Sequence, residues 1–172
     1  MAPTPSTLDN DVRVFVYRFM VENGRPPVPV EIGTALGTGS AEIETALKRL
    51  ADAHVLVLAP GTPYIWLANP LSALPSPFPV TVRDRQYFGI CFWDALGVIA
   101  MLGDEGTVTC LCPDCGDELT VRVRDGRVET QDYVVHYAIP AAHCGTTSAT
   151  RDRRSLPSGR KITETTGCPS AA

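Results

Sequence analysis

Apolar residues recur at helical spacing through the first third of the chain. We expect a helix that starts at Asp9 or Asn10 and runs through Glu22, since Asp and Asn favour helix starts. The segment Asn23-Gly24-Arg25-Pro26-Pro27 ends it, because glycine and proline both stop helices. A second helix is predicted from about Val30 to Leu36 and a third from Ser40. The apolar positions of the first and third helices are Val12, Phe15, Val16, Phe19, Met20, Ile43, Ala46, Leu47 and Leu50.

Two short apolar runs follow these helices, at 55–58 and 64–67, and a Pro/Gly-containing turn separates them. Three helices followed by a hairpin is the winged-helix plan, so we predict a winged-helix-like domain over residues 1–68. This fold often binds DNA. The third helix carries Glu42, Glu44, Lys48 and Arg49. That mixture suits a phosphate surface poorly, so we expect a structural role and no nucleic-acid partner.

The proline-rich stretch 69–79 is a natural linker, after which the pattern changes. Strands are predicted at 80–83, 107–110, 119–124, 128–130 and 133–139, with one helix from about Cys91. We therefore expect an α+β protein whose second domain, residues 80–143, is a mixed β-sheet with a flanking helix. Residues 144–172 carry few apolar positions and no periodicity, so a disordered tail is predicted.

Composition narrows the function classes. The 172 residues are 44% apolar with a net charge of −4, which disfavours strong nonspecific nucleic-acid binding. No run approaches the length of a membrane span, and the N-terminus has no apolar segment typical of a secretion signal. We expect a cytoplasmic protein with no membrane partner. In that compartment the six cysteines are thiols or metal ligands more often than disulfides.

One candidate chemical pair lies at the start of the predicted second-domain helix. Cys91 and Asp94 are three residues apart, and such residues share a helix face. A thiol at a helix N-terminus ionises more readily, because the exposed N–H groups and the dipole stabilise the thiolate. A carboxyl in an apolar setting can hold a proton and donate it. The plainer alternative is a small buried cysteine beside an acidic first-turn residue that favours the dipole.

A second cysteine group is denser. The segment Cys110-Leu111-Cys112-Pro113-Asp114-Cys115-Gly116 contains a knuckle-like Cys112/Cys115 turn that is suited to one metal ion, with zinc as the hypothesis. Zinc in a structural site takes four ligands, and other donors stand at no diagnostic spacing: Cys110, Cys144, Cys168, His136 and His143. Free thiols, or an occasional disulfide, are the alternative. For His136, on an apolar predicted strand, a core or edge position is favoured over a catalytic base.

The order of these features resembles the organomercurial (alkylmercury) lyase family. A helical N-terminal domain precedes a proline-rich connection, then aromatic-x-x-Cys-x-x-Asp from Phe88 to Asp94, a Val-Thr-Cys-x-Cys strand and a His-aromatic strand. The similarity covers roughly residues 10–143, and its best local match is YFGICFWDALGVIAML.

The resemblance implies a mechanism. In that family two cysteine thiolates take the mercury of R–Hg⁺ and an aspartate protonates the departing carbon. Cys91 matches the helix-start cysteine, Asp94 the proton donor, and Cys112 a further cysteine usually regarded as structural. The family's second catalytic cysteine precedes the His-aromatic pair, but here residues 131–135 (Gln-Asp-Tyr-Val-Val) contain none.

The resemblance also implies the ligands and partners. No cofactor is required, an organomercurial is the substrate, and Hg(II) is the product ligand, held by Cys91. Cys110, Cys112 and Cys115 are further candidate metal ligands. External thiols or a mercuric reductase would accept the metal. Two alternatives stay open: a non-catalytic thiol or metal-binding protein on the same scaffold, and a metal-responsive winged-helix regulator.

Overall fold

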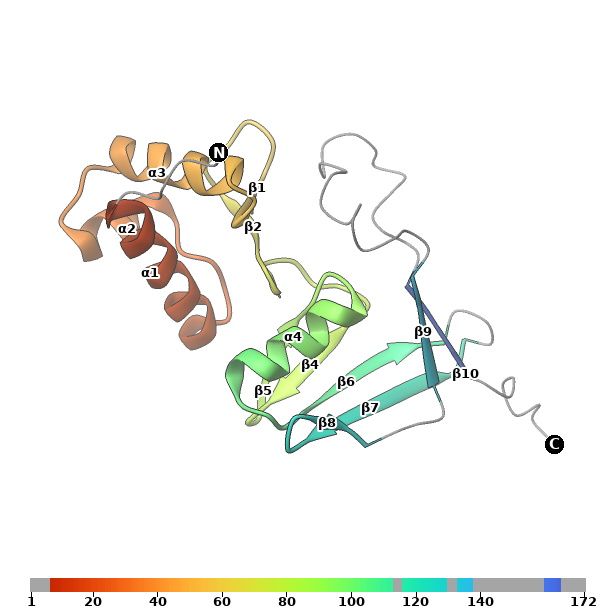
Figure 1. Cartoon of the computed structure of the whole chain (residues 1–172). Helices are drawn as coiled ribbons and strands as arrows, with labels where there is room; N and C mark the ends of the chain where they lie inside the picture. Colours follow the sequence, from red (N-terminus) through yellow and green to blue (C-terminus); the bar gives the residue numbers. More distant parts are fainter. Residues whose placement is uncertain (1–6, 113–115, 130–132, 138–159, 165–172) are drawn as a thin grey trace. The chain divides into compact units, whose positions relative to one another are not determined.

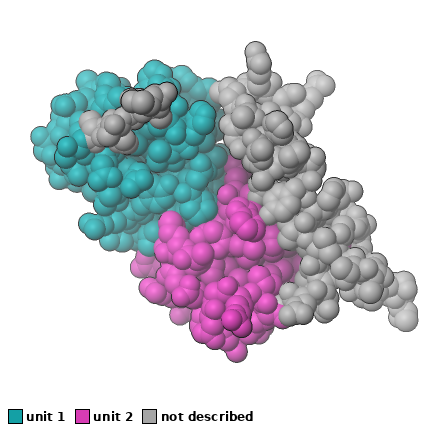
Figure 2. All heavy atoms as spheres, viewed as in Figure 1, with its two compact units in different colours: residues 1–74 teal, residues 75–172 magenta. Residues whose placement is uncertain are grey.

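The computed structural model describes residues 7–112, 116–129, 133–137 and 160–164, with side chains described up to Glu129. The chain divides into two compact units, residues 1–74 and 75–172 (Figure 1; Figure 2). The strands are antiparallel, and with four helices they confirm the expected α+β class. No described helix is both long and apolar enough to span a membrane.

The first unit begins with three helices: α1 (Thr7–Asn23), α2 (Pro29–Leu36) and α3 (Ser40–Asp52). Their boundaries lie within a few residues of the predicted ones. The periodic apolar residues meet in one core, in which Val12, Val16, Ile43 and Leu47 are fully buried. Gly37 ends α2 in the left-handed conformation at φ 64°, which glycine adopts without a steric penalty.

A small antiparallel sheet follows, in the order β1 (Leu56–Leu58), β2 (Ile65–Ala68) and β3 (Leu71–Ser72). The predicted linker therefore includes a strand: Leu71 pairs with Ala68 and is buried. The hydroxyl of Tyr17 on α1 donates to the carbonyl of Asn69 at 2.7 Å, which ties this turn to the helices. The winged-helix interpretation stays a prediction.

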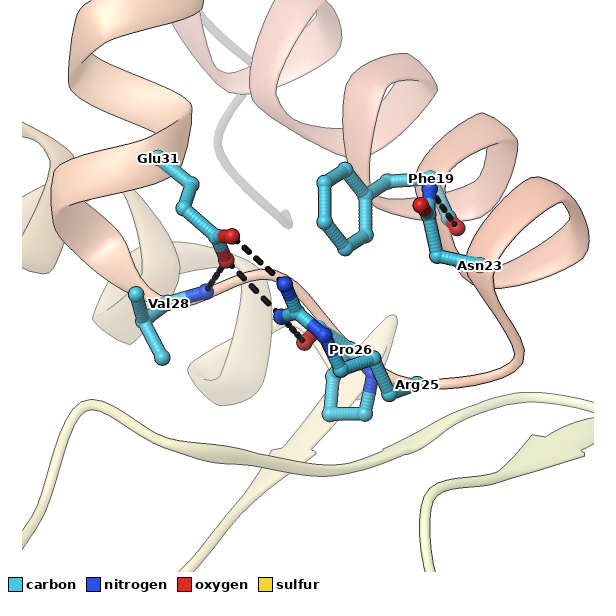
Figure 3. Close-up of polar contacts among 6 residues, drawn as sticks. All are labelled: Phe19, Asn23, Arg25, Pro26, Val28 and Glu31. Atoms are coloured by element: carbon cyan, nitrogen blue, oxygen red, sulfur yellow. Dashed lines mark hydrogen bonds and ion pairs between the residues drawn. The ribbon is translucent and has the colours of Figure 1, made fainter.

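Two ion pairs hold the helices of this unit. Asp9, which is 5% exposed, accepts three hydrogen bonds from the Arg49 guanidinium at 2.6–3.1 Å, and so joins α1 to α3. The Arg25 guanidinium donates to both oxygens of Glu31, at 2.7 and 2.9 Å, and lies 4.9 Å from the centre of the Phe19 ring (Figure 3). Glu31 also accepts from the Val28 N–H at 2.8 Å, which caps the start of α2.

The second unit is built on a five-stranded sheet in the order β5-β4-β6-β7-β8. Its strands are β4 (Pro79–Val82), β5 (Arg85–Phe88), β6 (Gly106–Leu111), β7 (Glu118–Arg124) and β8 (Arg127–Val128). Each of the four pairings is antiparallel, whereas a mixed sheet was expected. Connectivity accounts for part of this: tight turns join β4 to β5 and β7 to β8, and strands joined by a hairpin are antiparallel neighbours.

Helix α4 (Phe92–Leu102) is the single helix described in this unit, and it packs against β4, β5 and β6. Every second residue of each strand faces it, as the two-residue period of a strand requires. One row runs across four neighbouring strands, and its members are directly opposed and buried: Tyr87, Val80, Val108 and Val121.

Strands β9 (Tyr133–Tyr137) and β10 (Arg160–Glu164) pair antiparallel with each other. The predicted disordered tail includes β10, since the segment Arg-Lys-Ile-Thr-Glu forms a strand that we did not expect. The remainder of that tail lies outside the described residues.

The Glu31 ion pair gives a pH-dependent stability. Its hydrogen bonds from Arg25 and Val28 lower the pKa of Glu31 from 4.5 to about 2. A carboxyl whose pKa is lower in the folded state stabilises the fold above its unfolded pKa and loses that contribution as the pH falls. We therefore expect the stability difference between wild type and Glu31→Gln to be constant at neutral pH and to shrink from about pH 4.5 to about pH 2, as followed by urea denaturation.

The matched control is Glu44→Gln on α3, whose carboxylate accepts from the neutral Ser40 hydroxyl at 3.4 Å. An equal pH dependence in the two variants would show that the Arg25 contact is not responsible.

Candidate active site at the N-terminus of helix α4

The structure brings Cys91 and Asp94 together. The Cys91 thiol donates a hydrogen bond to Oδ2 of Asp94 at 2.7 Å, and the Asp94 backbone N–H donates to the Cys91 sulfur at 3.3 Å. Cys91 is therefore the N-cap of α4, with its backbone extended at φ −141°. Its sulfur occupies the place where helix N–H groups favour negative charge. The site is a thiol hydrogen-bonded to a carboxylate at the start of a helix.

Cys91 and Asp94 differ in their exposure to solvent. Cys91 is 2% exposed, whereas Asp94 is partly exposed on the first turn of the helix. The thiol is thus shielded by protein, while the carboxylate remains within reach of solvent.

Gly89 sets the position of this first turn, and the sequence analysis missed it. A Cβ built on Gly89 would lie 2.4 Å from the Ala95 nitrogen and 2.9 Å from the Asp94 carbonyl carbon. Only glycine lets the α4 backbone approach the sheet this closely. An isolated glycine two residues before Cys91 was the available signal.

Residues before β4 hold Gly89 in turn. The Ser76 hydroxyl donates to the Gly89 carbonyl, and the Gly89 N–H donates to the carbonyl of Phe78 at 3.2 Å. The Phe78 ring meets Phe92 edge-on at 6.4 Å. The predicted linker 69–79 therefore contributes to the surroundings of Cys91. No sequence motif pointed to these contacts.

Trp93 adds an aromatic surface beside the pair. It lies between Phe92 and Asp94 and is 62% exposed. Its exposed position next to Asp94 in α4 is a feature that the helix periodicity did not identify.

Cys110 and Cys112 lie elsewhere in the same unit. Both are buried, at 4% and 3% exposed, and neither forms a disulfide. Burial, together with the neighbouring Cys112, raises the pKa of the Cys110 thiol to about 11, so that it is neutral at pH 7.

The zinc hypothesis gains no support from the described part of the chain, in which no cluster of three or more His, Cys, Asp or Glu side chains could hold a metal ion. Cys115, Cys144, Cys168 and His143 lie outside the described residues. His136 belongs to the β9 backbone opposite Lys161, and its side chain is not described.

Helix α3 of the first unit offers few available cations. Arg49 is engaged by Asp9, and Lys48 pairs with Asp52 at 3.1 Å. Glu42 and Glu44 are exposed on the same helix. The absence of a nucleic-acid partner stays a prediction.

Comparisons with known proteins find a matching family model and a matching solved structure. The second unit is an α+β domain with a thiol–carboxylate pair at a helix start, and residues 71–152 match the family model described as alkylmercury lyase. A solved structure titled "Crystal structure of the mercury-bound form of MerB2" matches with a TM-score of 0.58 at 19% identity. The match covers 75% of this chain and 70% of that one. No curated protein sequence matches the chain.

The match over residues 71–152 agrees with the family resemblance that the motifs suggested. At 19% identity, the solved neighbour shows that the fold is shared. It carries no information about turnover by this chain.

Gly89→Ala tests whether the close approach of α4 sets the site. The added methyl meets backbone atoms that are unable to rotate away, so we expect a loss of about 1–3 kcal/mol of stability, typical of overpacking. Cys91 should also react faster with a thiol reagent such as dithionitrobenzoate, because its hydrogen bond to Asp94 is displaced.

Gly39→Ala is the matched control, because its added Cβ meets no atom within 4 Å and its φ is −66°. If both variants kept wild-type stability and thiol reactivity, Gly89 would not position the pair.

Proposed function

We propose that this protein cleaves carbon–mercury bonds of organomercurials, with Cys91 as the mercury ligand and Asp94 as the proton donor. The hydrogen bond from the Cys91 thiol to the Asp94 carboxylate carries the proposal. The family-model match over residues 71–152 supports the substrate class. A cytoplasmic location, where thiols stay reduced, is part of the proposal.

In the first step the sulfur of Cys91 binds the mercury of R–Hg–X. Soft thiolates are the preferred ligands of soft metals. The S–Hg bond forms, X leaves as an anion, and the thiol proton passes along the existing hydrogen bond to Asp94. The product of this step is R–Hg–S(Cys91) beside a protonated carboxyl.

In the second step a thiolate from solution adds to the mercury. The added sulfur donor weakens the carbon–mercury bond, whose electron pair takes the proton of Asp94. The hydrocarbon RH leaves, Hg(II) remains between Cys91 and the external sulfur, and Asp94 is again a carboxylate. An external thiol is invoked because residues 131–135 contain no cysteine. Thiols or a mercuric reductase then remove the metal.

The partial exposure of Asp94 and the exposure of Trp93 fit this sequence of events. The carboxyl must reach a carbon that stays outside the buried sulfur. An aromatic ring beside it gives the organic group an apolar surface to contact.

Cys91→Ser tests the role of the sulfur. A hydroxyl is a poor ligand for mercury, so we expect the release of benzene from phenylmercury, with excess thiol present, to fall to the rate of thiol alone. Gas chromatography of the headspace measures this release.

The matched control for this variant is Cys168→Ser, a thiol remote in sequence from the pair, which should keep the wild-type rate. Full activity in Cys91→Ser would exclude the proposed site. Mercury binding by the wild type without hydrocarbon release would favour the non-catalytic alternative.

Asp94→Asn tests the proton donor. The amide keeps the shape of the carboxyl but carries no acidic proton, so we expect phenylmercury to bind while benzene release slows by about 10²–10⁴-fold. Single-turnover kinetics separate binding from release.

Asp84→Asn is the control for that variant, because Asp84 is exposed in the β4–β5 turn at φ 64°, a conformation that asparagine tolerates. Weakened binding with unchanged release in Asp94→Asn would contradict the assigned role.

A further inference from the structure

We propose that Cys110 and Cys112 form a two-thiol acceptor site for Hg(II), separate from the Cys91–Asp94 pair. The inference deepens the proposed function, because it names where the product metal can be held. Its binding test, however, does not depend on catalysis.

The two thiols face the same side of the sheet. Cys110 lies in β6 opposite Leu119, and Cys112 continues the same ladder, since its N–H donates to the Asp117 carbonyl at 2.8 Å. Side chains two residues apart on a strand share a face and stand about 6.6 Å apart along it. Leu111 between them is 65% exposed, which confirms the alternation.

The topology brings this pair to the end of the unit where α4 begins. A Cβ on Gly106 would lie 2.9 Å from the side chain of Ile99, so β6 starts beneath the later part of α4. From there β6 runs back along the helix toward its N-terminus (Figure 1). A strand advances about 3.3 Å per residue, whereas a helix advances about 1.5 Å. The four residues from Gly106 to Cys110 therefore carry β6 back past several residues of α4.

Cys110 also shares a row with the residues that seat Cys91. Gly89, Phe78, Cys110 and Leu119 each lie two residues from a member of the buried row Tyr87-Val80-Val108-Val121, on the same face. The Gly89 N–H to Phe78 carbonyl bond continues that ladder. The two thiols are therefore at the Cys91 end of the helix-covered face.

The donor set fits Hg(II) better than zinc. Structural zinc takes four ligands, and no such cluster exists among the described residues. Hg(II) is satisfied by two sulfur atoms in a near-linear arrangement, and two thiols on one strand face provide them. Their burial, at 4% and 3% exposed, would shield the bound ion from solvent thiols.

Transfer to this site is a thiol exchange that needs no oxidant. Hg(II) held by Cys91 and an external sulfur gives up both bonds, and bonds to Cys110 and Cys112 form. The two protons of the incoming thiols pass to the two sulfurs that leave. The products are Hg bound by two cysteines, the Cys91 thiol and a free external thiol.

The test uses the full chain with serine at Cys91, Cys115, Cys144 and Cys168, so that Cys110 and Cys112 are the remaining cysteines. Mercuric chloride is added with excess glutathione, the Hg(II)–glutathione complex is removed by gel filtration, and the mercury retained per chain is measured by elemental analysis. We expect one Hg(II) per chain. Adding Cys110→Ser or Cys112→Ser should weaken apparent binding by at least about 10-fold, because the second bond is then no longer intramolecular.

Alanine variants at the same two positions, checked by circular dichroism, guard against misfolding caused by a buried hydroxyl. Binding that is unchanged when either sulfur is removed from a folded chain would overturn the proposal, as would no binding by the folded chain with both thiols present. Retention of Hg(II) by this Cys91-free chain supports the acceptor site even if wild type releases no hydrocarbon. Hydrocarbon release by wild type without such retention refutes the acceptor site and leaves the lyase proposal intact.

Discussion

The close contact between Gly89 and the first turn of α4 is the constraint on which the site depends. The Gly89 Cα faces the backbone of Asp94 and Ala95 with no room for a side chain. The helix therefore starts against the sheet, and Cys91 becomes its cap. The same turn points the Asp94 carboxylate back to the Cys91 sulfur, 2.7 Å away. Ser76 and Phe78 fix Gly89 from the other side. The contact between Cys91 and Asp94 is therefore a consequence of the close packing of α4 against Gly89.

The antiparallel connectivity of the second unit has a further effect. Because β6 returns beneath α4, its cysteines reach the end of the unit at which the helix starts. The unit thus concentrates sulfur at one end of the helix-covered face: a hydrogen-bonded thiol at the helix cap, and two buried thiols at the end of β6 and just past it. In this account Cys91 reacts with the organomercurial, and Cys110 and Cys112 hold the Hg(II) that is released.

The sequence predicted much of this arrangement because its local signals are strong. Helices α1 to α3 follow from their apolar period, and the Cys91–Asp94 spacing follows from helix geometry. Strand β5 was missed because Arg85–Phe88 shows no clean alternation and directly precedes the helix. The contacts of Gly89, Ser76 and Phe78 were missed because they join segments that only the folded sheet brings together. The antiparallel pairing was not predicted, because strand pairing joins segments distant in the sequence and no single segment encodes it.

The most direct test of the central claim is whether the Asp94 carboxyl supplies the proton that the departing carbon takes. Phenylmercury is cleaved in a single turnover by the full chain in D₂O with excess thiol, and the benzene is analysed by mass spectrometry. The account predicts monodeuterated benzene, formed faster than by thiol alone. The Asp94→Asn variant should lose this acceleration, and the Asp84→Asn variant should keep it. Equal rates with and without the protein, or acceleration that survives the loss of the Asp94 carboxyl, would contradict it.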